Sequence, residues 1–566
     1  MVTNPSKLQA RIMNSFLVLM ILGGLIPVAA AALNELTSEI IRDKIEQIRF
    51  FEEVRLGDGL IASTDVLPEI YELQNFQPVW TDGSVIRQLL DAVRKIRDDG
   101  INPEDYHLND LLQYHHSIQA IGQDDPWLSA DFDILLTDSL IRLLYHLYFG
   151  KVDPTTLNPG WNLLRPFNYR NPARVVLEII QSGSVESTIE SLKPQYPAYR
   201  RLRAALAKYR LIQSTGGWIP ISSGPVLRQG DRDPRVALIR KRLARTDEIA
   251  AENDDPEFFD EALSQAVQRF QIREEIDPDG AVDRPTLIEL NYPVDGRIDQ
   301  IRANLERMRW FLHDLPDQFV VVDIAGFSID YYKKNRITWT ARAQVGDPFT
   351  QTPCFKAEIK YMVLNPTWMV PPGMASREYL PKLRENPDFL KQTDLKIIDR
   401  KGKFVDPDKI KWDAYSKGAF PYKLFQEPGP TNPLGRIKFI CPNPFYIYLH
   451  DTPETERFAE EWRAFSAGCI RVQRPSEFAM LLLGDQSGWD FGKLTRTIAS
   501  GQTRTIFLPL KIPVMFLYVT VLAEQNGMIF FRDDIYGRDE AVIKGLEAPF
   551  EFKNVDSRIF KWRSSK

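Results

Sequence analysis

The sequence predicts a multidomain α+β protein: a helical scaffold domain, then a small three-helix unit, then a β-rich domain with an inserted capping subdomain. Length is the first reason, because 566 residues exceed what one hydrophobic core usually organises. The second is a change of pattern, since apolar residues recur at helical spacing through 35–215 and alternate, as in strands, beyond residue 315. The third is a joint rich in Ser, Gly and Pro at 214–225, which is typical of a domain boundary.

The N-terminal segment, 1–33, is typical of an export signal. Lys7 and Arg11 precede an uncharged apolar stretch that runs from Phe16 to Leu33. Its alanine-rich end favours a cleavable signal peptide, whereas its length also suffices for a membrane anchor. Either outcome exports the rest of the chain to the periplasm. If the segment stays uncleaved, the cytoplasmic membrane becomes a partner.

Within the scaffold domain, 35–215, two segments carry strong helical patterns. Residues 84–99 are amphipathic, and residues 133–152 are apolar nearly all round. A helix that is apolar on every side belongs in the middle of a bundle. The region shows no catalytic spacing, so we expect a scaffold here.

Charge and cysteine content exclude several classes of protein. The net charge is -5, and no stripe of Arg and Lys is interleaved with aromatic residues, so nucleic acid is not an expected partner. Cys354, Cys441 and Cys469 are too few for a disulfide framework, and their odd number leaves one thiol free. With only six histidines and no Cys/His cluster, the sequence predicts no metal and no other cofactor.

A compact unit, 226–291, comes after the joint. Residues 236–244 and 259–271 are amphipathic, and 277–291 form a turn with a short helix. The unit resembles the peptidoglycan-binding three-helix module in its Gly-Asp, Ala-Val-x-x-Phe-Gln and Asp-Gly-x-x-x-x-x-Thr-Leu elements, although Asp283-Arg284 stands where that family usually has Gly. The resemblance implies glycan binding, with a plain helical spacer as the alternative.

The β-rich domain is predicted over 315–505, with strand patterns such as QFVVVDIAGFSIDYY and RIKFICPN. A polar, mildly basic stretch, 376–428, interrupts it and predicts an inserted lid over the site, with solvated surface as the alternative. Residues 506–566 are predicted to be a β-rich C-terminal extension packed on this domain.

A histidine and a cysteine within the β-rich domain can provide covalent chemistry. The segment FYIYLH, 445–450, alternates, which places Tyr446, Tyr448 and His450 on one face of a strand. After a polar helical excursion, the chain can return to bring Cys469 within reach of His450. A thiol needs such a base, because little of it is ionised near neutrality.

The residues beside the cysteine favour acyl transfer. Gly468 permits a tight turn, in which the amides of Gly468 and Cys469 can point together at a developing oxyanion. Arg471 can anchor a substrate carboxylate or stabilise the thiolate, or it can be a plain surface arginine. Asp451 is poorly placed to orient His450, since adjacent strand residues face opposite ways, so a backbone carbonyl is the better candidate.

The ordered set His450-Asp-Thr-Pro, Ser466-Ala-Gly-Cys469 and Ile470-Arg-Val resembles the YkuD-type catalytic domain of L,D-transpeptidases, especially the long periplasmic YcbB-like class. The resemblance extends to NPTWMVPP, GPTNPLGRIKF and the segments 67–80 and 513–537. Shorter members of the family commonly have His where this chain has Ala467, which leaves His450 as the motif's histidine here.

The resemblance implies an enzyme that forms 3→3 peptidoglycan crosslinks through a cysteine thioester and is acylated by carbapenems. Cys469 would be the nucleophile, His450 the general base and Gly468 part of the oxyanion hole. Implied partners are peptidoglycan stem peptides and glycan. Two alternatives stay open, an L,D-carboxypeptidase and a wall-binding scaffold with an idle cysteine. The implied substrate-binding residues, some of which can equally have packing roles, are Tyr448, Arg471, Ser466, Trp368 and Asn432.

Overall fold

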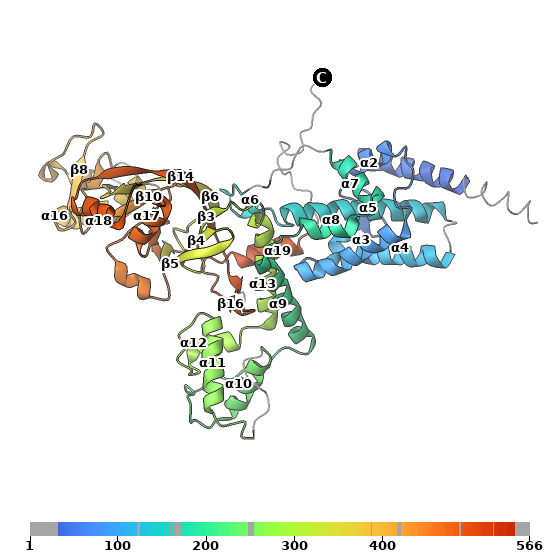
Figure 1. The fold of residues 1–566 in the computed structure, drawn as a ribbon, viewed down its shortest axis with the longest axis horizontal. Coiled ribbons are helices and arrows are strands. Elements are labelled where there is room, and N and C mark those ends of the chain that lie inside the picture. The colour runs from blue at the N-terminus through green and yellow to red at the C-terminus, as the bar shows by residue number, and fades with distance from the viewer. Residues whose placement is uncertain are drawn as a thin grey trace, which may run out of the picture.

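A computed structural model of the chain has three lobes: helical, β-rich and a smaller three-helix lobe (Figure 1). It describes residues 32–549 except 52, 122–124, 159, 164, 166–170, 247–253, 387, 416–419, 486–487 and 525. Nearly all of the predicted export signal thus lies outside the described residues. Within the described part of the chain, none of the helices combines the length and apolar content needed to cross a bilayer. The α+β prediction is confirmed.

The helical lobe is a bundle around one buried helix, α5 (Pro126–Phe149). As predicted for 133–152, this helix is surrounded by the others, and a continuous apolar core joins them. The remaining elements of this lobe are a helix over 32–50, a β1–β2 hairpin (Arg55–Leu56, Gly59–Leu60), α2 (Leu67–Leu73), α3 (Gly83–Lys95), two 3₁₀ turns (Ile96–Asp99, Pro103–Tyr106), α4 (Leu108–Ile121), α7 (Pro172–Gln181) and α8 (Val185–Leu192). Helix α6 (Pro154–Leu157) instead packs through Leu157 on the core of the β-rich lobe.

Helix α9 (Pro197–Ser214), which the sequence places in the scaffold domain, packs elsewhere. It lies against α13 (Val294–Phe311) and the hairpin of β15 (Val521–Ala523) and β16 (Ile529–Phe531), with which it shares a separate core. These elements join the three lobes (Figure 1).

In the three-helix unit, each helix starts at an aspartate. Asp233, Asp260 and Asp283 accept a backbone N–H from the first turn of α10 (Pro234–Ala244), α11 (Glu261–Arg273) and α12 (Arg284–Leu290). Such caps satisfy amides that have no partner within the helix. The unit has its own apolar core, and a bridge between Leu227 and Val282 closes it.

Within the described residues, nine strands form the main sheet, in the order β12-β5-β13-β11-β10-β6-β14-β3-β4, and β4 also pairs with β5. The sheet therefore closes on itself around a large core. We call the side that points away from this core the outer face. The strands are β3 (Gln318–Asp323), β4 (Ser328–Lys333), β5 (Arg336–Gly346), β6 (Phe355–Leu364), β10 (Ile437–Ile440), β11 (Leu449–His450), β12 (Ala464–Ser466), β13 (Ile470–Val472) and β14 (Arg504–Leu517).

Strand β14 differs from the predicted C-terminal extension. It runs across the predicted boundary at 505/506 and lies inside the sheet, antiparallel to β6 and parallel to β3. C-terminal to this strand, α19 (Asp539–Glu547) packs on the core of the β-rich domain from outside the sheet, whereas the β15–β16 hairpin belongs to the separate core with α9 and α13.

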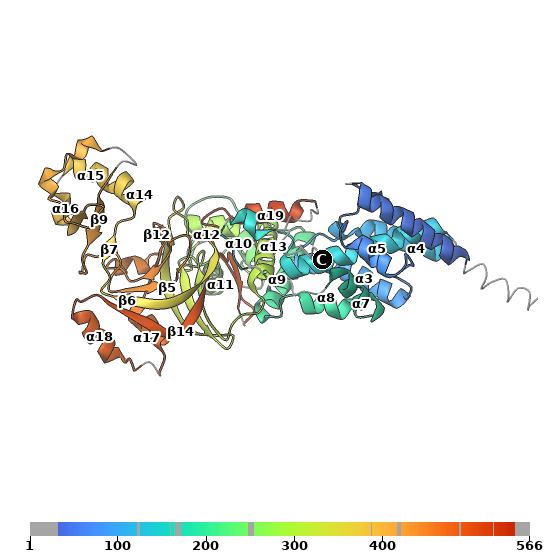
Figure 2. The ribbon, with the colours of Figure 1, turned by 90° about the horizontal axis from the view of Figure 1, so that it is seen from above.

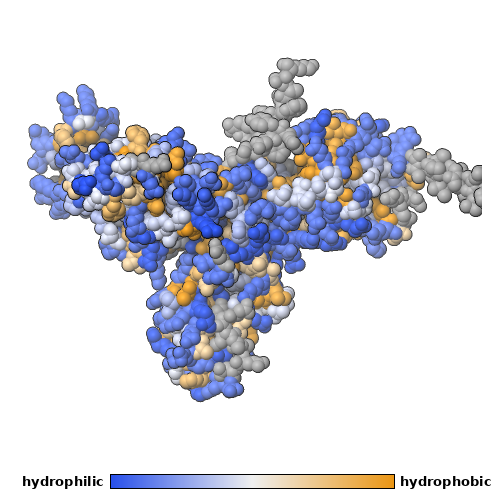
Figure 3. All heavy atoms as spheres, in the orientation of Figure 1, coloured by the Kyte–Doolittle hydropathy of each residue, from blue (hydrophilic) through white to orange (hydrophobic). Residues whose placement is uncertain are grey.

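The insertion between β6 and β10 has its own apolar core and a small sheet, in the order β7-β9-β8. It stands on one side of the main sheet, whereas α17 (Pro475–Leu483) and α18 (Phe491–Ala499) lie on the other (Figure 2). Its elements are β7 (Trp368–Met369), α14 (Pro372–Met374), a π-helical turn (Ala375–Tyr379), α15 (Leu380–Glu385), α16 (Phe389–Gln392), β8 (Leu395–Ile398) and β9 (Lys423–Gln426). Hydrophobic patches interrupt a mostly hydrophilic surface on both large lobes (Figure 3).

Candidate active site

Parallel pairing between β11 and β13 brings the predicted histidine and cysteine segments together. The register aligns Leu449 with Ile470 and His450 with Arg471. Leu449 and Ile470 are completely buried in the core, so their neighbours along each strand point outward. The outer face here therefore carries four predicted site residues: Tyr448, His450, Cys469 and Arg471.

The predicted strand 445–450 is shorter than expected. Regular pairing covers only Leu449–His450, and Tyr446 has a positive φ of 58°, which takes it out of the alternation. Tyr446 is exposed, and its carbonyl accepts a weak hydrogen bond from the Cys469 thiol at 3.8 Å. Tyr446 thus contacts the nucleophile through its backbone carbonyl and not through its ring.

His450 is held as a neutral base. Its side chain is only 5 % exposed, and Nδ1 lies 2.5 Å from the backbone carbonyl of Asp451. That carbonyl can only accept, so the proton sits on Nδ1 and Nε2 keeps a free lone pair. Burial lowers the pKa of His450 to about 3, and the charges of Arg471 and Lys438 act in the same direction. A backbone carbonyl orients the ring, as predicted, while the Asp451 carboxylate binds the amides of Arg436 and Thr452.

The turn before the cysteine requires glycine. Gly468 has φ +107°, and a Cβ there would lie 3.1 Å from Ile447 Cδ1. The Ser466 hydroxyl accepts the Gly468 amide at 3.0 Å and donates to the Cys469 carbonyl at 2.5 Å. Ser466 thus fixes the turn, and in this conformation the Gly468 amide points at the Ser466 hydroxyl inside the turn. The oxyanion role predicted for that amide requires the hydroxyl to release it.

The Cys469 thiol is half-buried at the outer face. Burial raises its pKa, whereas a hydrogen bond from the Tyr448 amide and the charges of Lys438 and Arg471 lower it. Among the hydrogen bonds of the described residues, none joins this sulfur to His450. Transfer of the thiol proton to Nε2 therefore needs a side-chain rotation, which is common in resting enzymes.

Lys438 is a site residue that sequence reasoning missed. It pairs with His450 across β10 and β11, and its ammonium lies 3.9 Å from the centroid of the Tyr448 ring. Burial lowers its pKa, while a charge on Cys469 would raise it. A lysine in an alternating strand carries no local signal of this role, because only the pairing of the strands places it beside the histidine.

The other predicted substrate-binding residues have different surroundings. Arg471 binds Glu454 at 2.7 Å and Gln344 at 3.0 Å. Its charge lowers the pKa of Cys469, which favours the predicted role of stabilising the thiolate. Asn432 is completely buried and binds the carbonyls of Pro366 and Glu427, so it fastens the insertion rather than lining a cleft. Trp368 is half-buried in the insertion beside Tyr379.

The segment after β5 supports the cysteine turn from behind. The Asp347 amide and the Thr350 hydroxyl both donate to the Ser466 carbonyl, at 2.8 and 3.0 Å. The Thr352 hydroxyl donates to the Gly468 carbonyl at 2.9 Å. Three hydrogen bonds thus tie 346–354 to the backbone of the turn.

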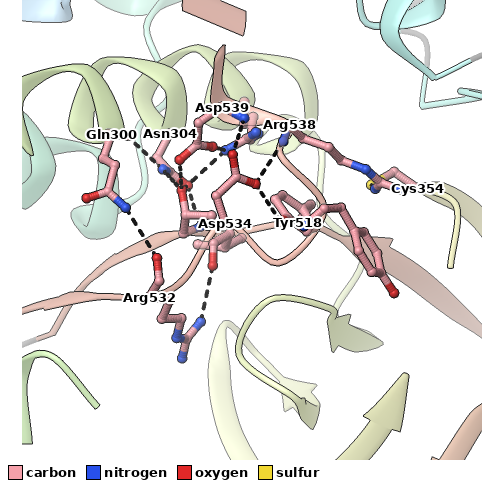
Figure 4. Close-up of polar contacts among 12 residues, drawn as sticks. Gln300, Asn304, Cys354, Tyr518, Arg532, Asp534, Arg538 and Asp539 are labelled. Atoms are coloured by element: carbon pink, nitrogen blue, oxygen red, sulfur yellow. Dashed lines mark hydrogen bonds and ion pairs between the residues drawn. The ribbon is translucent and has the colours of Figure 1, made fainter. Parts of the chain in front are cut away.

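The C-terminal part of the chain in turn holds this segment. The Tyr536 hydroxyl donates to the Gly346 carbonyl at 2.6 Å. Arg538 donates to the Thr352 carbonyl at 3.0 Å and to the Cys354 sulfur at 3.2 Å (Figure 4). Asp534 fixes the loop that carries Arg538 by accepting its amide at 2.8 Å. No local pattern in the sequence indicates these contacts, because they link residues far apart along the chain.

Comparison of the chain with known proteins shows which family it belongs to. Residues 65–206 match the model of a scaffold domain, and residues 317–485 match the model of the L,D-transpeptidase catalytic domain. A Haemophilus influenzae protein named "Putative L,D-transpeptidase" is 32% identical over 492 residues, which cover 86% of this chain and 81% of that protein. The chain belongs to the L,D-transpeptidase family. Such a cell-wall enzyme acts on peptidoglycan, which fits the predicted export.

Two solved L,D-transpeptidases are also similar to this family member. The structure from Xylanimonas cellulosilytica is 14% identical, with a TM-score of 0.18, and covers 52% of this chain and 99% of its own. The one from Stackebrandtia nassauensis is 11% identical, with a TM-score of 0.19, and covers 53% of this chain and 97% of its own. At these scores the superpositions carry no structural argument.

Proposed function

We propose that this L,D-transpeptidase forms 3→3 peptidoglycan crosslinks through a thioester on Cys469. The observation that carries the proposal is a neutral, buried imidazole, His450, on the same sheet face as the thiol and one strand away. Its Nδ1 proton is committed to the Asp451 carbonyl, so Nε2 is the atom that takes the thiol proton.

In the first half-reaction, the Cys469 sulfur attacks the carbonyl of the third stem residue, a diamino acid, while its proton passes to His450. The oxyanion binds the backbone amides of Cys469 and, once Ser466 releases it, Gly468. When the tetrahedral intermediate collapses, the imidazolium returns the proton to the amine of D-Ala, which leaves. A thioester and a neutral His450 remain.

In the second half-reaction, the side-chain amine of another stem attacks the thioester carbonyl. His450 removes the extra proton from that nitrogen and delivers it to the departing sulfur. An amide joins the two third residues, and the free thiol is restored. Lys438 and Arg471, whose charges lower the Cys469 pKa, stabilise the sulfur as it leaves.

We also propose roles for two other parts of the chain. The insertion, with its own core, is a lid over the outer face, since Asn432 anchors it just before the strands that carry Lys438 and His450. The three-helix unit binds glycan, and its separate core supports an independent binding module. An ion pair between Glu274 of the unit and Arg297 of α13 attaches this module to the rest of the molecule.

Incubation with a purified disaccharide-tetrapeptide tests the reaction. Mass spectrometry should find crosslinked dimer and free D-Ala with the parent, and neither with Cys469→Ala. Release of D-Ala that leaves tripeptide without dimer would mean a carboxypeptidase, in which water resolves the thioester. If neither product forms and no carbapenem adduct forms on intact protein, the protein is a wall-binding scaffold.

A further inference from the structure

An aromatic pair stands on the outer face, three and four strands away from β13, the strand that Cys469 precedes. Tyr361 on β6 is aligned with Phe507 on β14, and their ring centroids are 5.3 Å apart. Phe507 is 73 % exposed, although a ring of this size usually gains by burial. Leu510, just beyond it on β14, is also largely exposed. An exposed apolar patch held on a rigid sheet is typical of a binding surface.

This patch is continuous with the candidate active site. Tyr361 is aligned with Ile440 on β10, the strand that also carries Lys438. The Lys438 ammonium covers the Tyr448 ring, and Tyr361 is close enough to Tyr448 to help raise its pKa. The neighbouring helices lie on the other face, where Phe478 of α17 packs against Phe439.

We propose that Tyr361 and Phe507 form a subsite for a sugar ring of the peptidoglycan disaccharide whose stem peptide is bound at Cys469. The inference rests on the proposed function, because it takes the substrate to be a stem peptide attached to glycan. An aromatic ring offers an apolar face to the C–H side of a pyranose, and the Tyr361 hydroxyl can hydrogen-bond the sugar's polar groups.

The reach of the substrate agrees with this placement. Three stem residues separate the sugar from the bond to be cut, and three extended residues span about 10 Å. Strands lie about 4.8 Å apart, so the three steps from Cys469, at the start of β13, to Tyr361 on β6 cover about 14 Å, and Phe507 on β14 lies one step further. The three stem residues cover most of the distance from Cys469, and the sugar rings at the far end of the stem extend the substrate onto the aromatic pair.

Binding to the full-length Cys469→Ala protein tests the subsite without turnover. Calorimetry would compare a disaccharide-tetrapeptide with the same tetrapeptide lacking sugar. We expect Phe507→Ala to weaken binding of the first about tenfold and to leave binding of the second within about twofold, while Phe507→Trp restores binding. The matched control is Phe491→Ala, which removes an exposed phenylalanine from α18 on the other side of the sheet.

Two outcomes overturn the subsite. Equal loss for both ligands means that Phe507 contacts peptide or supports the fold, and no loss for either means that the pair is not used. The proposed function fails separately, if the parent with Cys469 intact forms no carbapenem adduct and no dimer. A parent that fails this second test while its Cys469→Ala form still shows the sugar-dependent loss would keep the subsite and lose the transpeptidase reaction.

Discussion

Two cysteines of the same domain, Cys469 and Cys354, lie close to arginines but in opposite settings. Cys354 is 4 % exposed, its sulfur is 3.2 Å from Arg538, and it lines a cavity of about 110 Å³. Burial raises its pKa, which Arg538 and Arg307 lower. The same opposition of burial and positive charge acts on Cys469. Positive charge alone therefore does not distinguish a nucleophile.

Position on the sheet distinguishes them. Cys469 comes directly after a glycine turn on the outer face, where His450 supplies a neutral base and substrate can approach. Cys354 precedes β6 on the inner side, where its nearest polar partner is a guanidinium, which cannot accept a proton. The difference teaches that an open face with an oriented base makes a thiol reactive.

The sharpest test replaces each of the two cysteines by alanine, one at a time. Cys469→Ala should abolish the carbapenem adduct on intact protein, because no nucleophile remains. Cys354→Ala should keep full adduct formation while losing about 1–2 kcal/mol of stability from the buried contacts. An adduct that survives in Cys469→Ala, or disappears in Cys354→Ala with the fold intact by circular dichroism, would reverse the assignment.

Removal of the base should have the next largest effect. His450→Gln keeps a polar side chain of similar reach but cannot accept the thiol proton, so we expect carbapenem acylation to slow by about 10²–10⁴-fold. Stopped-flow fluorescence measures that rate. Parent-like acylation in this variant would show that Cys469 is activated by another group, with Lys438 the nearest candidate.

Gly468→Ala tests the glycine turn before Cys469, which Cys354 lacks. Its φ of +107° and the 3.1 Å approach of Ile447 to an added Cβ impose about 1–3 kcal/mol of strain. The turn should shift, and the acylation rate should fall about 10–100-fold. Ala467→Gly, which changes the exposed neighbour without a clash, is the control. If both variants acylate at the parent rate, the turn's geometry does not matter for reaction.

Arg538 should have a smaller effect, because it reaches the cysteine turn indirectly, through its hydrogen bonds to Gln351 and Thr352. Arg538→Gln is expected to lower the acylation rate constant about three- to tenfold with little change in carbapenem affinity, and Arg538→Lys should recover part of it. Lys544→Gln, an exposed change on the nearby α19, serves as control. A variant that loses only melting temperature, at an unchanged acylation rate, would leave Arg538 with a purely structural role.

The pH dependence should show the smallest change. Because burial depresses the pKa of His450 to about 3, the folded protein keeps this base unprotonated well below the pH of about 6.5 at which free imidazole gains its proton. Carbapenem acylation should then vary less than about twofold between pH 5 and 7 on account of the histidine. A fall in rate centred near pH 6.5 would mean that water reaches His450 before the reaction.

The sequence predicted the parts that depend on local patterns. The helices expected at 236–244, 259–271 and within 277–291, and the central position of α5, follow from residue types and spacing within each segment. The Cys469 turn and the face of His450 were also predictable, because glycine and strand alternation act over a few residues.

The remaining features depend on partners far away along the chain. The sequence does not show that Lys438 lies beside His450, that α9 leaves the scaffold bundle, or that Arg538 supports the turn. Asn432 illustrates the same limit, since only the folded loop shows that its side chain is buried. Register and long-range packing are set by the whole domain, so a local pattern does not encode them.

The place of β14 has a consequence for biogenesis. Residues 317–485 match the catalytic domain, yet β14, at Arg504–Leu517, inserts between β3 and β6 and pairs with β3 in parallel. During synthesis from the N-terminus, β3 and β6 lack their shared neighbour until β14 has also been made. Because such distant pairing forms slowly, the catalytic fold is completed late, after its N-terminal lobes. The sheet that carries Cys469 is therefore complete only after β14 has joined it.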